Sequence, residues 1–94
     1  MEDRIGRVKE MEARLNRLLA WLDHQEGDIG EDVRALEGYF RTAWREDFEA
    51  DEAGEIPAGI PRGVLSEDGL YDALTAYEEI RAEGRERPEN RIQA

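Results

Sequence analysis

A cluster of helix-breaking residues restricts the fold of this chain more than any other feature. Residues 54–63 exclude a continuous helix because they include Gly54, Pro57, Gly59, Pro61 and Gly63. The preceding stretch is strongly acidic, since six of the ten residues from Glu46 to Glu55 are Asp or Glu. Apolar side chains interrupt this charge, namely Phe48, Ile56, Ile60 and Val64. The pattern predicts an ordered acidic connector over residues 45–66, with these apolar side chains anchored on a core.

Helical periodicity predicts two amphipathic helices before the connector. In residues 2–25, apolar side chains recur at spacings of three and four, as in a helix packed against another: Val8, Met11, Leu15, Leu18 and Leu22. A second stripe from Ile29 to Trp44 predicts a helix over residues 31–44. Only a short turn near Gly27 separates the two. We therefore expect an antiparallel helical hairpin.

A third helix is predicted over residues 67–83. Ser66 is a favourable N-cap, and Leu65 with Leu70 matches a hydrophobic staple across that cap. The helix is expected to end near Gly84. We therefore predict an all-α fold, in which the hairpin and the third helix form a small three-helix bundle joined by the acidic connector. Residues 1–84 form one domain, because 94 residues cannot support a second core, and residues 85–94 form a polar tail.

The charge of the chain restricts its binding partners. The net charge is −11, and residues 23–79 alone contain seventeen acidic and four basic residues. Such a surface repels nucleic acid and anionic lipid, and it attracts basic proteins. Cysteine is absent, no apolar run approaches the roughly 20 residues of a membrane span, and the N-terminus is too polar for a secretory signal. We expect a cytoplasmic protein that contacts neither nucleic acid nor membranes directly.

No residue pattern indicates catalysis or a cofactor. The chain has one histidine, His24, and one serine, Ser66, whose position is explained by capping. Asp47, Glu49 and Asp51 alternate like the first ligands of a calcium-binding EF-hand loop. However, Glu52 stands where that loop needs glycine, and Ala58 where it needs glutamate. We expect neither an enzyme nor a metal site.

The connector is the expected binding site. Its candidate partner-binding residues are Asp47, Glu49, Asp51, Glu52, Glu55 and Arg62. The simpler alternative is that these carboxylates are solvated, or paired with Arg41, Arg45 and Arg62. Arg62 is expected to tie the connector together, because one guanidinium can satisfy several acceptors.

From Trp44 onward the chain resembles a bacterial family of short acidic helical proteins known only as a domain of unknown function, number 4298. The resemblance rests on Trp44, Asp47, Glu49 to Glu52, Gly54, Pro57, Arg62 to Asp68, Leu70 and Tyr71, about a third of the chain. Phe48 and Gly69 depart from it, where Tyr and Ala are more typical. The first half matches in helical pattern only. The resemblance implies no activity and no catalytic residue.

These observations leave three functional hypotheses. The favoured one is a non-enzymatic interaction module whose acidic region binds a basic protein partner. A second is a nucleic-acid mimic, for example a phage-encoded inhibitor of a nucleic-acid-binding protein such as a CRISPR effector. The third is a metal or small-ligand binder with the connector as its site. The apolar stripe of residues 8–22 would also permit a homodimer through the first helix.

Overall fold

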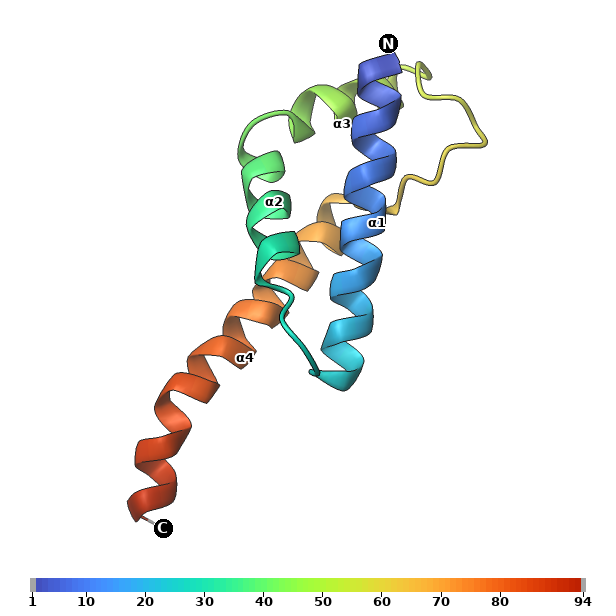
Figure 1. Cartoon of the computed structure of the whole chain (residues 1–94). Helices are drawn as coiled ribbons and strands as arrows, with labels where there is room; N and C mark the ends of the chain where they lie inside the picture. Colours follow the sequence, from blue (N-terminus) through green and yellow to red (C-terminus); the bar gives the residue numbers. More distant parts are fainter. Residues whose placement is uncertain (1, 94) are drawn as a thin grey trace.

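The computed structural model describes the backbone of residues 2–93 and the side chains of residues 4–83. Four α-helices and one short 3-10 helix make up the regular structure of residues 2–93, which contain no strand. They are α1 (Glu2–His24), α2 (Gly30–Arg41), α3 (Trp44–Glu52), η1 (Gly63–Leu65) and α4 (Glu67–Gln93) (Figure 1). The all-α class is therefore confirmed, with four α-helices in place of the three predicted.

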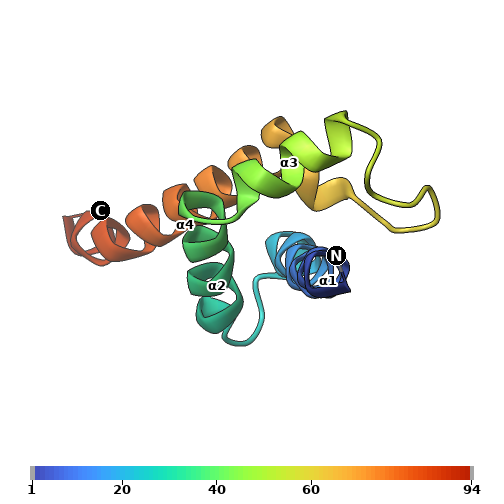
Figure 2. The same cartoon turned by 90° about the horizontal axis from the view of Figure 1, so that it is seen from above.

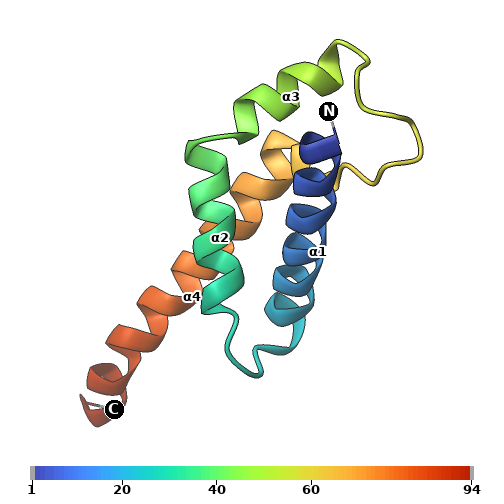
Figure 3. The ribbon, with the colours of Figure 1, turned by 45° about the horizontal axis from the view of Figure 1, so that its top comes forward.

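Helices α1 and α2 lie side by side and run in opposite directions (Figures 1 and 3). The predicted stripe of α1 provides Val8, Leu15 and Leu18 to the core, where each is buried. This stripe is used within the chain, and a homodimer through it would require the core to open. Among the described residues, no helix is both long enough and apolar enough to cross a membrane.

The predicted second helix is divided in two. Helix α2 ends at Arg41, and α3 begins at Trp44 in a different direction (Figure 3). The sequence predicts residue 44 as the end of a helix and residues 45–52 as the start of the connector. They form a helix of their own because Trp44, Asp47 and Ala50 recur every three residues and are all buried. The indole of Trp44 fixes this helix, since its Nε1 donates to the carbonyl oxygen of Val64 in η1 at 2.9 Å.

The irregular part of the connector is limited to residues 53–62. Ile56 and Val64 are buried, and Phe48 and Ile60 pack against the core, so the predicted anchors are confirmed. Gly54 has a φ of +80°, a left-handed conformation that other residues adopt only with strain. The sharp turn at this glycine ends α3 and starts the loop seen beside the first turn of α1 in Figure 1.

Helix α4 begins as predicted and extends further than predicted. The Ser66 hydroxyl accepts the backbone N–H of Gly69 at 3.2 Å, and Leu65 and Leu70 are both buried around this cap. The helix then continues past Gly84 to Gln93, where a polar tail had been expected, and extends away from the other helices (Figure 2). A single glycine costs a helix only about 1 kcal/mol, so Gly84 does not by itself end the helix.

Candidate functional site

The carboxylate of Asp47 is fully buried and holds three helices together. It has 0% exposed surface. The hydroxyl of Tyr39 on α2 donates to it at 2.7 Å. The guanidinium of Arg7 on α1 donates twice, from Nε at 2.8 Å and Nη2 at 2.6 Å, and Arg4 donates from Nε at 3.1 Å. Every buried polar side-chain atom in the described part of the chain has a hydrogen-bond partner.

The titration of this cluster suits a structural role. Burial by itself would raise the pKa of Asp47, but the hydrogen bonds from Arg7, Tyr39 and Arg4 outweigh it and lower that pKa. Burial and the hydrogen bond to Asp47 raise the pKa of Tyr39. The hydrogen bond to Asp47 also raises the pKa of Arg7. The pKa of each group is therefore moved further from neutral pH, whereas a general acid or base works best with a pKa near the working pH.

The position of Asp47 corrects one expectation from the sequence. Asp47 had been predicted to face a binding partner, but its carboxylate is satisfied inside the chain and cannot be reached by one. The three side chains that bind it, Arg4, Arg7 and Tyr39, are not among the residues that the sequence predicts for a site. A signal existed, because Arg4 continues the apolar stripe of α1 backward by one turn from Val8. A charged residue in a core position of a helix indicates a buried partner of opposite charge.

The other predicted site residues lie in different environments. Asp51 is half-buried and accepts a hydrogen bond from Nη1 of Arg62. Arg62 also donates from Nη2 to the carbonyl of Pro57 at 2.7 Å, so it ties the irregular segment back to α3, as expected. Glu55 is exposed and lies 3.7 Å from Nη1 of Arg4. Glu49 and Glu52 are exposed and form no ion pair with a side chain that the structure describes.

The predicted site residues therefore do not converge on one point. Asp47 faces inward, Asp51 faces Arg62, and Glu49 and Glu52 face solvent. Within residues 4–83, no three acidic or histidine side chains are grouped in a way that could hold a metal ion.

A second carboxylate links α1 to α2. Asp32 accepts hydrogen bonds from Nη1 of Arg14 and from Nε and Nη2 of Arg17, each at 2.9 Å. The hydrogen bond from Arg17 is the main cause of the lowered pKa of Asp32. Together, Asp32 and Asp47 bind all four arginines of α1. These four arginines form ion pairs within the chain, so they do not neutralise the acidic side chains that remain on the surface.

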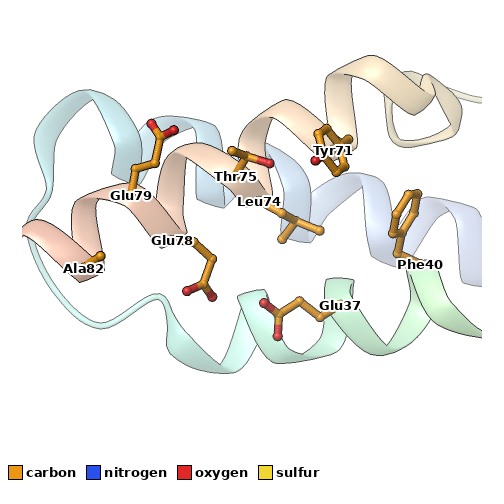
Figure 4. Close-up of a pocket in the computed structure, with 8 residues that line it drawn as sticks. All are labelled: Glu37, Phe40, Tyr71, Leu74, Thr75, Glu78, Glu79 and Ala82. Carbon is orange, nitrogen blue, oxygen red and sulfur yellow. The ribbon is translucent and has the colours of Figure 1, made fainter.

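An open groove lies between α2 and α4 (Figure 4). Its volume is about 470 Å³, and its lining is mostly apolar. Eight residues line it: Glu37, Phe40, Tyr71, Leu74, Thr75, Glu78, Glu79 and Ala82. Tyr71 is 57% exposed, which is unusual for a large aromatic side chain. Every charged residue of the lining is a glutamate. We refer to these eight residues as the α2/α4 groove.

The profile of a family described as Domain of unknown function (DUF4298) matches residues 1–86. No curated protein and no solved structure matches the chain.

Proposed function

The chain belongs to the DUF4298 family, and we propose that it is a non-enzymatic interaction module that binds a basic protein partner. The α2/α4 groove carries this proposal. It combines an exposed apolar floor with charges of one sign, which is the combination expected of a surface that docks a cationic protein. The proposal moves the main contact from the connector, where the sequence placed it, to this groove.

The floor of the groove supplies the residue types that contribute most to binding. Aromatic residues are enriched at the centres of protein interfaces, where burial of their large apolar area stabilises a complex. Tyr71 and Phe40 are placed to do this, with Leu74 beside them (Figure 4). Glu37, Glu78 and Glu79 would select a cationic partner over an anionic one, because like charges at an interface cost several kcal/mol.

The exposed acids of α3 and the connector have a secondary role in this proposal. Glu49, Glu52 and Glu55 add to the negative potential of the domain without lining the groove. Charges outside a contact accelerate the encounter of two proteins more than they strengthen the final complex, and salt screens the effect. We therefore expect them to change the association rate more than the affinity.

A pull-down with three charge-reversed variants tests the proposal. Each variant changes two acidic residues to lysine: Glu37 and Glu78 in the groove, Glu49 and Glu52 on α3, or, as a control, Asp23 at the end of α1 and Glu26 in the α1–α2 turn. We expect a basic protein that binds the wild type and the control but is lost from the groove variant. The proposal fails if every protein recovered with the wild type remains bound to all three variants.

The same complex can be used to test nucleic-acid mimicry. If the recovered protein binds DNA or RNA, its nucleic acid is added in competition at several salt concentrations. Mutual displacement would identify the chain as a mimic, whereas simultaneous binding would identify it as an adaptor.

A further inference from the structure

The residues of the α2/α4 groove follow the spacing of a helix–helix contact. On α4 they include Tyr71, Leu74, Glu78 and Ala82, at intervals of three or four residues, so they form one stripe along the helix. Helix α2 contributes Glu37 and Phe40 from one further stripe. The stripe on α4 spans about 16 Å, or three helical turns, at the rise of an α-helix. The groove therefore has the residue spacing and the length expected of a surface that packs against one further helix.

The groove is also asymmetric along its length. Figure 4 shows Phe40 and Tyr71 at one end, with Leu74 beside them. Further along α4, the carboxylate ends of Glu37 and Glu78 turn toward each other across the gap (Figure 4). Glu78 also contacts Nη1 of Arg81 at 3.6 Å, but both side chains are about half exposed and the contact is long. Such exposed pairs are weak, so a cation from a partner can replace Arg81.

We propose that this groove binds a single amphipathic helix of the basic partner, an inference that rests on the proposed function. An apolar side chain of that helix packs between Phe40, Tyr71 and Leu74. About one helical turn away, an arginine of the same helix lies between Glu37 and Glu78. The guanidinium fits this position because its planar donors can bind two carboxylates at once.

The chemistry of the groove favours a helix over an extended segment. An extended peptide leaves its backbone N–H and C=O groups to be satisfied by the receptor, usually by the edge of a sheet. Residues 2–93 contain no strand, and the floor of the groove is apolar. A helix satisfies its own backbone hydrogen bonds, so it can be buried against such a floor without leaving them unpaired.

Two synthetic peptides of equal composition test the shape of the ligand. Each has about 18 residues, long enough for a helix to form once it is bound. The first carries leucines at i, i+4 and i+7 with arginines one turn beyond them, and the second has the same leucines and arginines in an order without helical period. Each is titrated into the isotope-labelled full chain and followed by amide NMR shifts. We expect the periodic peptide alone to shift residues 37–40 and 71–82 and to become helical.

Variants of the chain test the two contacts separately. Glu37→Gln and Glu78→Gln should each weaken binding of the periodic peptide by about tenfold, the size expected for loss of one well-placed charge contact. The matched control Glu46→Gln on α3 should have no effect. Tyr71→Ala should weaken binding, while Leu19→Ala, which removes an exposed apolar side chain from α1, should not. Arg81→Gln should strengthen binding, because it removes the competing cation.

The possible outcomes separate this inference from the function it rests on. The inference is overturned if the two peptides bind equally well, if neither binds, or if the shifts fall on α3 instead of the groove. In each case the pull-down still decides whether the chain binds a basic protein. Sedimentation of the chain alone shows whether a second copy occupies the groove, and a dimer weakened by Tyr71→Ala would also overturn the inference.

Discussion

Replacing Asp47 with asparagine is the sharpest perturbation of this fold. The change removes a negative charge and leaves the size of the side chain almost unaltered, so no cavity forms. In the native protein the carboxylate accepts hydrogen bonds from Arg4, Arg7 and Tyr39. An asparagine offers one acceptor oxygen in place of two, and its amide nitrogen would face the donors of an arginine.

The size of the effect follows from the burial of the two partners. Removing one member of a fully buried ion pair typically costs about 3–5 kcal/mol, because the other charge is left uncompensated. Asp47 is fully buried, but the side chains of Arg4 and Arg7 are 25% and 33% exposed. They can recover some hydration, which reduces the expected loss to about 2–4 kcal/mol. A loss of about 3 kcal/mol corresponds to a fall in melting temperature of roughly 12–24 °C for a domain of this size.

Urea unfolding, followed by circular dichroism, measures this loss in free energy. Asp51→Asn is the matched control, because its pair with Arg62 is partly exposed and should contribute about 0–1 kcal/mol. A double-mutant cycle with Tyr39→Phe should give a coupling of about 1–2 kcal/mol between Tyr39 and Asp47. If Asp47→Asn unfolds within about 0.5 kcal/mol of the wild type, Asp47 does not hold the helices together and this reasoning is wrong.

Three further predictions concern acid stability and the connector. Because the pKa values of Asp32 and Asp47 are lowered in the folded state, their contribution is present above the ordinary aspartate pKa of about 4 and is lost as the pH falls below it. Unfolding free energy measured from pH 6 to pH 2 should show this fall, and Asp47→Asn should flatten it. Gly54→Ala should cost about 1–2 kcal/mol in urea unfolding because of its positive φ, whereas Gly59→Ala, with open space around it, should cost nothing measurable; equal losses would contradict this. Arg62→Lys keeps the charge but cannot reach both Asp51 and the carbonyl of Pro57, so amide exchange should accelerate in residues 53–62 and remain unchanged in α1.

The parts of the fold that could be predicted are those determined by local patterns in the sequence. The stripe of α1, the anchors of the connector and the cap at Ser66 all follow local rules, and the structure contains each of them. Helix α3 was not predicted because one of its three buried residues is Asp47. An aspartate in an acid-rich segment is normally expected to lie on the surface, so the buried face of this helix could not be recognised. Only the arrangement of α1 over α3 shows that two arginines neutralise Asp47.

The groove was not predictable for a different reason. Phe40 lies on the apolar stripe from Ile29 to Trp44, and the pattern of such a stripe is the same whether or not another helix covers it. Whether a stripe is covered depends on the relative directions of α2 and α4, which no local rule fixes. The sequence placed its binding site on the most acidic segment, yet the acids that line apolar surface are Glu37, Glu78 and Glu79.

Photo-crosslinking in the native cells tests the central claim most directly. A photoreactive amino acid replaces Thr75 in the α2/α4 groove or, as the control, Glu46 on α3. We predict a covalent adduct with a basic protein from position 75, absent in the presence of Tyr71→Ala, and little or none from position 46. An adduct from position 46 alone, or none from either position, would contradict a docking role for the groove.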